Sequence, residues 1–318
     1  MKDGMYTIGE FASLLGVSKA VIYKWEKEGK INKAKRVKRG KTMYRYYTAE
    51  DIRDLRVDMN IQTPLTKRRK QLFLNFKGGT GKSVISANYG YRLAQHGFKI
   101  LMVDLDPQGH LTKCLGCNPE DFSKTLYDVI INKVPIQSVI ISSKLTTLDI
   151  IPANLGLSPI ELSLTSLHAR EFKLKRVLTD IEDSYDIIVL DAPPNIGLLN
   201  LNAILSVNDL LVPVLADFLS YDGLKILFET LRDIEDEFEY VLDNIYIFLN
   251  RYNESMNIST RSRDAIRKNY ADFVCDTMIR QNTTLSDATA LGMSIFEYAP
   301  NSRAAIDINK LVNEILDI

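Results

Sequence analysis

The first 60 residues carry apolar positions at the spacing of two short helices, followed by a basic segment and a third helix. The helical positions are Ile8, Phe11, Leu14 and Leu15, then Val21, Ile22 and Trp25 after a break at Gly16. Thr7 with Glu10, and Ser18, are suitable caps for the starts of the two helices. Two helices joined by a glycine turn predict a helix-turn-helix, in which the second helix enters the major groove of DNA.

Residues 33–47 carry basic side chains around Gly40, and alternating aromatic side chains follow them. We expect a β-hairpin wing whose cations lie along DNA phosphates and position the preceding helix without reading bases. The wing cations are Lys35, Arg36, Lys38, Arg39 and Lys41, and the candidates for base contacts near the start of the second helix are Ser18, Lys19, Tyr23 and Lys24. A third helix is expected from Asp51 to about Met59.

From residue 71 onward, apolar runs of strand length alternate with longer helical stretches. The expected strands are 71–75, 99–106, 148–151, 187–190, 210–214, 245–249 and about 273–278, and helices are expected at 83–96, 171–183 and 221–237. The alternation predicts an α/β fold with a doubly wound, mostly parallel sheet, preceded by the small winged helix-turn-helix unit. Ligands of such sheets bind beyond the carboxyl ends of the strands.

A glycine-rich turn joins the first of these strands to its helix. Gly78, Gly79 and Gly81 let the backbone turn so that its N–H groups converge on anionic oxygens. Lys82 then supplies a point charge for the terminal phosphates, and Ser83 can offer a hydroxyl to Mg²⁺. These residues predict a phosphate-binding loop. A tight turn that carries only surface lysines is the alternative.

Acidic residues stand at two of the predicted strand ends. Carboxylates near a triphosphate are costly unless a cation or a reacting water lies between them. Asp191 has the apolar lead-in of a Walker B aspartate, which holds Mg²⁺ directly or through a water. Asp104 and Asp106 are two residues apart on one strand, so we expect both side chains to face the γ-phosphate. Capping of a strand end is the alternative for each carboxylate.

The formal net charge is zero, but the charges are segregated along the chain. Residues 1–70 hold 18 Lys and Arg against 8 Asp and Glu, so the remaining residues hold 22 against 32. A concentrated positive field favours phosphate backbones or acidic membranes as partners. We therefore expect a DNA-binding domain at 1–58, a basic linker at 59–70 whose charge also touches DNA, and a larger domain at 71–318.

Cysteine content and hydropathy indicate a cytoplasmic protein. Cys114, Cys117 and Cys275 are too few for a disulfide framework, and the sequence has no signal peptide and no long apolar run. Cys114 and Cys117 have the spacing of a metal or redox pair, but no second pair or histidine cluster completes a set of four ligands.

The phosphate loop departs from the usual pattern, because Phe76 stands where the first glycine is expected and Lys77 follows it. Lys-Gly-Gly-Thr-Gly-Lys-Ser resembles the deviant Walker A loop of the ParA/MinD ATPases. The resemblance implies that Lys77 is their signature lysine, which reaches across an ATP-bound homodimer to the partner's phosphates. It also implies that Asp106 orients the attacking water and that Asp104 supports the metal shell.

The resemblance covers essentially all of residues 71–318 and implies binding of ATP and Mg²⁺. The implied nucleotide-binding residues are Lys77, Gly78, Gly79, Thr80, Gly81, Lys82, Ser83, Val84 and Asn250, with Lys77, Lys82 and Asp106 catalytic and Ser83, Asp104 and Asp191 at the metal. Pro194 and the turn after it resemble the switch that senses the γ-phosphate. His110 replaces the family's asparagine, so the role of that position does not carry over.

ParA proteins also bind DNA without sequence preference when they dimerise with ATP. The candidate residues for this contact are Arg261, Arg263, Arg267, Lys268 and Arg280. Thr284 occupies a place where some relatives carry an arginine, so that contact cannot be transferred. Ordinary solvated arginines are the alternative for each candidate.

The amino-terminal segment 5–57 resembles the MerR-type winged helix-turn-helix, whose wing ends in a similar Tyr-Arg-x-Tyr before a helix start. A small helical domain that serves only dimerisation is the alternative. Together, the two resemblances imply a partition ATPase associated with the nucleoid, with a ParB-like centromere-binding partner and a repressor function at its own operator.

Three other interpretations were weighed. A nucleotide-gated transcriptional regulator without a segregation role is the first. A MinD-like membrane ATPase would need a basic amphipathic helix at the carboxyl end, whereas 307–318 is acidic, so no membrane partner is expected. An iron–sulfur carrier would rest on Cys114 and Cys117 alone and fails the ligand count.

Overall fold

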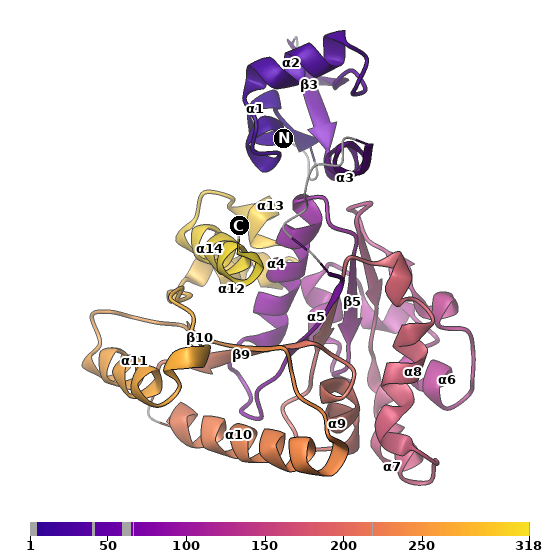
Figure 1. The fold of residues 1–318 in the computed structure, drawn as a ribbon, viewed down its shortest axis with the longest axis vertical. Coiled ribbons are helices and arrows are strands. Elements are labelled where there is room, and N and C mark those ends of the chain that lie inside the picture. The colour runs from indigo at the N-terminus through magenta and orange to yellow at the C-terminus, as the bar shows by residue number, and fades with distance from the viewer. Residues whose placement is uncertain (1–4, 40–41, 59–64, 66, 218, 318) are drawn as a thin grey trace.

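The computed structural model describes residues 5–39, 42–58, 65, 67–217 and 219–317. These residues form a small unit with a three-stranded sheet and a larger unit with a seven-stranded sheet, which follow one another along the long axis of the molecule (Figure 1). Lys41, expected on the wing, lies outside the described residues, and the side chain of Arg39 is not described.

The small unit is a winged helix-turn-helix with its own core. Its elements are β1 (Met5–Tyr6), α1 (Ile8–Leu14), α2 (Lys19–Lys27), β2 (Lys35–Arg39), β3 (Thr42–Thr48) and α3 (Ala49–Asp58). The strands are antiparallel in the order β1-β3-β2. Phe11 stacks on Tyr47 with ring centroids 4.0 Å apart, and Ile22 and Ile52 are completely buried beside them. Thr7 and Glu10 form the expected capping box at the start of α1.

The larger unit is built on a sheet whose strands are parallel except for one at the edge. The strands are β4 (Arg69–Phe73), β5 (Ile100–Asp104), β6 (Ile141–Ser142), β7 (Leu148–Ile151), β8 (Ile187–Asp191), β9 (Asp209–Leu215) and β10 (Asn244–Asn250). Their order is β10-β9-β4-β8-β5-β7-β6, and β6 is antiparallel to β7. The doubly wound, mostly parallel sheet predicted from the sequence is confirmed.

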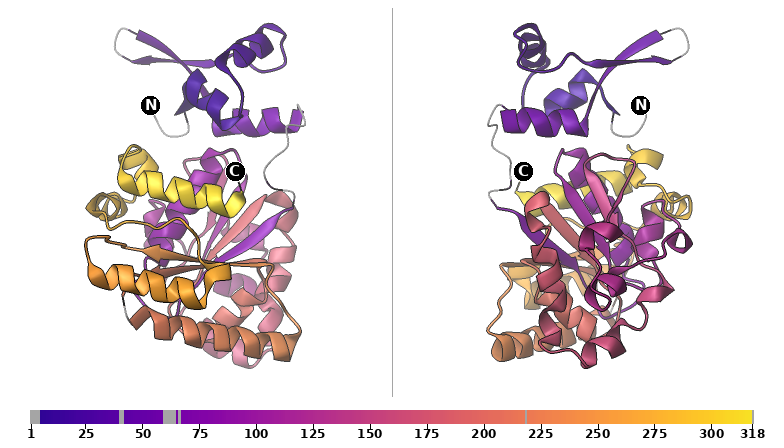
Figure 2. Two further views of the ribbon diagram at one scale, coloured as in Figure 1. Left: turned by 60° about the vertical axis from the view of Figure 1, so that its left-hand side comes forward. Right: turned by 90° about the vertical axis from the view of Figure 1, so that its right-hand side faces the viewer.

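Helices cover both faces of this sheet (Figures 1 and 2). The helices are α4 (Lys82–Gln95), α5 (His110–Cys114), α6 (Leu126–Ile130), α7 (Ile160–Thr165), α8 (Lys173–Thr179), α9 (Leu198–Ile204), α10 (Leu219–Phe238), α11 (Asn257–Asn269), α12 (Thr283–Ala290), α13 (Ile295–Tyr298) and α14 (Arg303–Leu316). One buried apolar cluster joins the sheet to α6 through α11, and a second joins it to α4, α5 and α12 through α14. Within the described ranges, no helix combines the length and apolarity needed to cross a bilayer.

Two expected elements differ from the structure. The strand expected at 273–278 is wrong, because only Val274 bridges to Ile247 and a short 3-10 turn, Ala271–Phe273, precedes it. The helix expected at 171–183 is limited to α8, with 3-10 turns on either side. In both places the apolar residues pack against the core without a continuous backbone ladder, and apolar spacing alone does not distinguish these cases.

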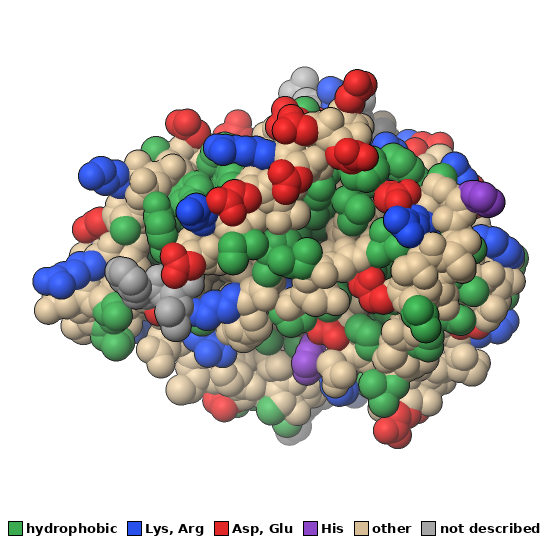
Figure 3. All heavy atoms as spheres, turned by 90° about the horizontal axis from the view of Figure 1, so that it is seen from below, with side chains coloured by type: hydrophobic (Ala, Val, Ile, Leu, Met, Phe, Trp, Pro, Cys, Tyr) green, Lys and Arg blue, Asp and Glu red, His purple; other side chains and the backbone are tan. Residues whose placement is uncertain are grey.

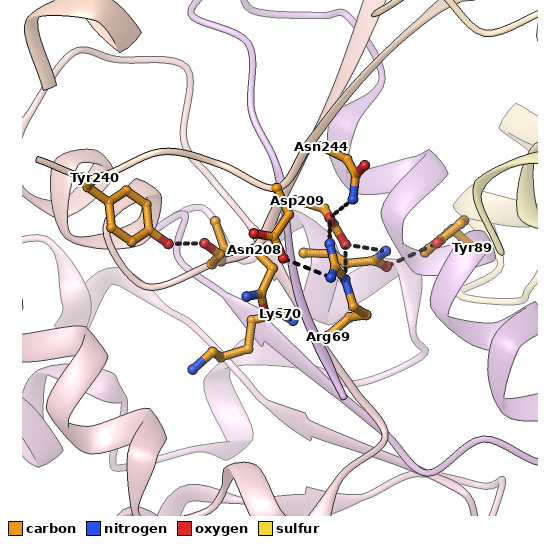
Figure 4. Close-up of polar contacts among 10 residues, drawn as sticks. Arg69, Lys70, Tyr89, Asn208, Asp209, Tyr240 and Asn244 are labelled. Carbon is orange, nitrogen blue, oxygen red and sulfur yellow. Dashed lines mark hydrogen bonds and ion pairs between the residues drawn. The ribbon is translucent and has the colours of Figure 1, made fainter. Parts of the chain in front are cut away.

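The basic run expected to end the linker belongs partly to the sheet. Arg69 opens β4, and its guanidinium pairs with Asp209 at the start of β9 and donates to Asp243 at 2.8 Å (Figure 4). Lys70 pairs with Glu182 at 2.5 Å. These two cations are therefore engaged in ion pairs at the amino ends of the strands, which does not support the expected contact of this run with DNA.

Candidate nucleotide-binding site

The turn between β4 and α4 has the backbone that a phosphate loop requires. Gly79 and Gly81 adopt positive φ angles of 74° and 88°, a region that other residues rarely occupy. A Cβ at Gly81 would lie 2.4 Å from Nδ2 of Asn250, so side chains are also excluded there by contact. The glycines at 79 and 81 are therefore required by local geometry, and α4 begins directly behind them without a side-chain cap at Gly81.

Lys82 lies buried at the start of α4. Its Nζ donates to the backbone oxygen of Asn75 at 3.0 Å, inside the loop. Burial lowers the pKa of Lys82, while the neighbouring carboxylates of Asp191 and Asp106 oppose that shift. A buried cation held on backbone oxygen is ready to exchange that acceptor for a phosphate oxygen.

Lys77 points toward the end of β9. Its Nζ lies 2.8 Å and 3.0 Å from the two carboxylate oxygens of Asp217 and 3.4 Å from Oγ of Ser220. Burial works against the charged form of Asp217, but the hydrogen bonds from Lys77 and Ser220 outweigh it and lower the Asp217 pKa. Asp217 was not among the residues singled out in the sequence, because 140 positions separate it from Lys77.

Asp191, at the end of β8, is completely buried and incompletely paired. Its Oδ1 accepts a hydrogen bond from Ser86 at 3.1 Å, whereas Oδ2 has no partner among the residues that the structure describes. Burial, followed by the nearby Asp104 charge, raises the pKa of Asp191 to about 8. An unpaired buried carboxylate oxygen close to the Ser83 hydroxyl suits a divalent cation, which would also offset the cost of burying this charge.

Asp104 and Asp106 lie in different environments, and the expectation that both face the γ-phosphate stays a prediction. Asp104 ends β5 and is completely buried, with Oδ2 accepting from the Thr112 backbone at 2.9 Å and from its hydroxyl at 2.7 Å. Burial raises the pKa of Asp104 to about 6. Asp106 lies beyond the strand end, so the alternation of side chains along a strand no longer applies to it. Its Oδ2 lies 3.8 Å from Nδ1 of His110.

A cavity of about 960 Å³ opens beside this loop. Of the expected nucleotide-site residues, its lining contains Gly79, Gly81, Lys82, Ser83, Val84 and Asp106. The lining residues not expected from the sequence include Gln108, Lys113, Asn118, Arg251 and the stretch 289–292. The cavity is large enough for a nucleotide, since small-molecule sites usually measure some 300–1,000 Å³.

Comparison with known proteins places this geometry in a family. A family model described as an AAA domain matches residues 69–244, and one described as a MerR HTH family regulatory protein matches residues 6–59. The cell division protein PomZ of Myxococcus xanthus is 46% identical over 270 residues, 85% of this chain and 85% of PomZ. The sporulation initiation inhibitor protein Soj of Bacillus subtilis is 33% identical over 76% of this chain and 95% of Soj. The chain belongs to the ParA family of partition ATPases.

Solved structures show the same fold. Cobyrinic acid a,c-diamide synthase from Mycobacterium smegmatis, with a bound ATP analogue and magnesium, superposes with a TM-score of 0.69 at 25% identity, covering 78% of this chain and 94% of that one. Cyanothece McdA in complex with ATP gives a TM-score of 0.72 at 22% identity over 80% of this chain and 98% of McdA. These structures share the fold over about four fifths of this chain.

In this ParA-type ATPase, Asn250 is tied to the phosphate loop. Its Nδ2 donates to the backbone oxygen of Thr80 at 2.7 Å, and the side chain is buried. Asn250 therefore positions the loop in the described structure, and its expected role in nucleotide binding stays a prediction.

Some of the cations expected to bind DNA are exposed, and others lie in ion pairs. On the small unit, Arg36 and Lys38 are exposed. Lys24 is exposed too but lies 3.8 Å from Glu28, and Lys35 lies 3.5 Å from Asp51. Ser18 caps α2 through a 3.4 Å hydrogen bond from Val21, which occupies its oxygen. Tyr23, Met43 and Tyr44 are exposed large side chains on the same elements, and the last two were missed because aromatic alternation indicated only a strand.

The ATPase unit divides its cations in the same way. On α11, Arg261 and Lys268 are exposed, while Arg267 pairs with Asp276 at 3.2 Å. Arg263 pairs with the adjacent Asp264. Arg280 lies 2.7 Å from the buried Asp307, which ties its guanidinium to α14 and favours a structural role.

Proposed function

We propose that this chain is a Mg²⁺-dependent ATPase whose ATP-bound homodimer holds nucleoid DNA and whose hydrolysis releases it, as part of a DNA segregation system. The observation that carries the proposal is the phosphate loop with two lysines, Lys77 and Lys82, beside the carboxylates of Asp106 and Asp191. Lys82 alone would serve nucleotide binding. The additional Lys77 at the mouth of the same loop supports a site that a second copy completes.

The proposed roles follow from the positions of the side chains. The backbone of the loop, Gly78 to Val84, receives the phosphates, and Lys82 neutralises their charge. Mg²⁺, held by Ser83 and Asp191 with support from Asp104, would neutralise phosphate charge at the carboxyl ends of β5 and β8. Asp106 is buried beside the cavity, where it can hold a water in line with the terminal phosphate.

The face that contains the strand ends supports pairing of two copies. Figure 3 shows this face, with apolar side chains distributed among Lys, Arg, Asp and Glu. Leu155 follows β7 and is 68% exposed, and Ile196 follows β8 and is 65% exposed. A second copy that covered this face would remove the apolar surface of these two side chains from water, which favours pairing.

The ATPase proposal is tested by three single variants. Lys82→Ala and Asp106→Ala should each abolish phosphate release, because one lacks the phosphate cation and the other lacks the group that orients water. Asp106→Ala should still form an ATP-dependent dimer on DNA, whereas Lys77→Ala should keep some nucleotide affinity and lose the dimer. Turnover at the parental rate in Lys82→Ala or Asp106→Ala would contradict the assignment.

For DNA, we propose that exposed cations of α11 hold the nucleoid and that the winged helix-turn-helix represses the chain's own operator. A ParB-like centromere-binding protein is the proposed partner that stimulates hydrolysis. Because each neutralised phosphate releases counterions, affinity for random DNA should fall steeply with salt. Binding to operator and to random duplexes without nucleotide, with ADP and with ATP tests this, and ATP should favour the random duplex.

A nucleotide-gated transcriptional regulator is the second candidate. The observation that favours it is the direct contact between the DNA-binding unit and α4, the helix that begins at the phosphate loop. If nucleotide altered operator binding alone and left random DNA unaffected, this second function would replace the first.

A further inference from the structure

The winged helix-turn-helix is docked on the carboxyl end of α4. The hydroxyl of Tyr6 donates to the backbone oxygen of Gln95 at 2.9 Å. Arg56 of α3 donates to the oxygen of His96 at 2.6 Å and to that of Leu14 at 3.1 Å. The guanidinium charge therefore lies beside the carboxyl-terminal carbonyls of both α1 and α4, at the negative end of each helix dipole.

The same interface is closely packed. Arg56 is only 9% exposed and lies over the ring of Phe98, 5.3 Å from its centroid. At Gly97, a Cβ would come within 2.9 Å of Ile52 and 3.1 Å of the backbone oxygen of Ala49. The small unit is therefore held against α4 by hydrogen bonds and by side-chain packing around Gly97, in addition to the linker.

The contact surface between the small unit and the carboxyl end of α4, called the dock here, lies at one end of this helix. The phosphate loop lies at the other end. α4 runs 14 residues from Lys82 to Gln95, which corresponds to about 21 Å. The ribbon views place the small unit at one end of the long axis, beyond the carboxyl end of α4 (Figures 1 and 2). The nucleotide face is at the other end.

The DNA-reading elements point away from the ATPase unit. The dock uses β1 and α3, whereas α2 and the wing lie on the outer side in both views of Figure 2. Tyr23 on α2 and Tyr44 on β3 are 49% and 45% exposed. DNA can therefore bind the small unit while it stays docked.

We propose that the ATP-bound pair bridges two separate DNA duplexes, one on each winged helix-turn-helix. This inference rests on the proposed dimer through the nucleotide face. Two copies joined at that face carry their winged helices at opposite outer ends. Two α4 helices end to end already span about 42 Å, more than the roughly 34 Å that separates half-sites one turn apart on one duplex. The reading surfaces also face in opposite directions, so each takes its own double-stranded DNA.

A capture experiment tests the bridge. A duplex that carries the operator region, the DNA directly upstream of the chain's own coding sequence, is fixed on beads, and a second, fluorescent copy of it is offered in solution with the full chain. With a non-hydrolysable ATP analogue, the beads should retain the fluorescent duplex at least tenfold above the level with ADP. Lys77→Ala should reduce retention to the ADP level.

Two matched double variants separate the winged helix from the ATPase surface. Lys24→Ala with Lys38→Ala removes exposed cations of the small unit and should abolish retention of the second duplex. Lys225→Ala with Lys310→Ala removes exposed cations of α10 and α14, outside the proposed DNA contacts, and should leave most of it. The reverse pattern would overturn the bridge through the winged helices.

Light scattering on the same samples distinguishes a failure of the bridge from a failure of the dimer. A dimer that binds the fixed duplex but retains no second one overturns the bridge and leaves the proposed function standing. Failure to dimerise with the ATP analogue overturns both. X-ray scattering gives a further check, because the dimer should have close to twice the maximum dimension of the monomer. A dimension near that of the monomer would place both winged helices on one side and contradict the inference.

Discussion

In the phosphate loop, the side chain of Lys77 forms an ion pair with a residue that is distant in the sequence. The proposed role of Lys77 is to reach another chain, yet in the single chain it pairs with Asp217. The same Asp217 accepts the backbone N–H of Ser220 at 2.9 Å at the start of α10. Dimer formation therefore requires that Lys77 exchange one anionic partner for another.

The variant Asp217→Asn tests that exchange. Asparagine keeps the shape and still accepts the Ser220 N–H, but its neutral amide holds Lys77 less firmly. Both side chains of the pair are partly exposed, so the ion pair is worth about 0.2–1 kcal/mol. Because a homodimer exchanges two such pairs, we expect up to about a thirtyfold tighter ATP-dependent dimer, measured by sedimentation equilibrium. Asp222→Asn, an exchange of another acid in the first turn of α10, serves as the control, and equal dimer affinities in the two variants would contradict the role of Asp217.

At the scale of elements, the helix after the Walker B strand is capped by a different helix. α9 begins at Leu198 behind Gly197, which offers no side-chain cap. Glu161 of α7 supplies it, with Oε2 accepting the Leu198 N–H at 2.8 Å and Oε1 accepting that of Leu199 at 3.3 Å. The turn that resembles a γ-phosphate switch is thus attached to α7.

Removing this cap should weaken the start of α9. Glu161→Ala should lower the free energy of unfolding by about 1 kcal/mol, since it deletes an anion at a helix amino terminus. Glu161→Gln keeps one acceptor and should lose less. Urea unfolding of both variants measures the effect. If Glu161→Gln lost as much free energy of unfolding as Glu161→Ala, the cap would act through its charge alone.

A buried histidine at the carboxyl end of α4, His96, makes the free energy of unfolding depend on pH. Burial, with the nearby charges of Arg92 and Arg56, lowers the pKa of His96 to about 3, against about 6.5 in the unfolded chain. The folded state therefore binds this proton less readily. The stability linked to His96 is complete above pH 6.5 and is lost as the pH falls from there toward 3.

His96→Gln should reduce this acid sensitivity. Between pH 7 and pH 4 the parent should lose up to about 3 kcal/mol through His96, and the variant should lose correspondingly less. Urea unfolding at several pH values measures the slopes. His168→Gln, at an exposed histidine, is the control. Parallel slopes for the parent and His96→Gln would show that another group governs the acid loss.

At the scale of the whole molecule, the contact between the two units determines where DNA is held relative to the nucleotide. Arg56 contributes hydrogen bonds to both units and a ring contact, and burial lowers its pKa. A buried guanidinium is costly unless its donors are satisfied. The dock is therefore sensitive to this one side chain.

Arg56→Ala should release the small unit from α4. The expected result is a larger radius of gyration in X-ray scattering and faster amide exchange at 93–98, with ATP hydrolysis retained. Arg53→Ala, on the same helix, is the matched control. If scattering and exchange stayed at the parental values in Arg56→Ala, the packing around Gly97 would be sufficient to hold the dock.

Local signals in the sequence determined much of this protein. Apolar spacing predicted the helices of the small unit and most strands of the sheet, because side-chain periodicity follows backbone geometry directly. The glycines, Lys82 and Ser83 indicated the phosphate loop, since only glycine tolerates the positive φ at Gly79 and Gly81. Family resemblance added the identity of Lys77, which physical spacing alone did not supply.

Only the tertiary structure decided which distant groups meet. Asp217 meets Lys77, Glu161 caps α9, and Arg56 joins the small unit to α4, over separations of 140, 37 and 40 positions. The different environments of Asp104 and Asp106 depend on where β5 ends, which apolar spacing places too late. Such contacts depend on the packing of whole elements, and no local pattern of residues encodes them. The sequence determined most elements and indicated the phosphate loop, and packing decided the partner of Lys77 and the position of the small unit.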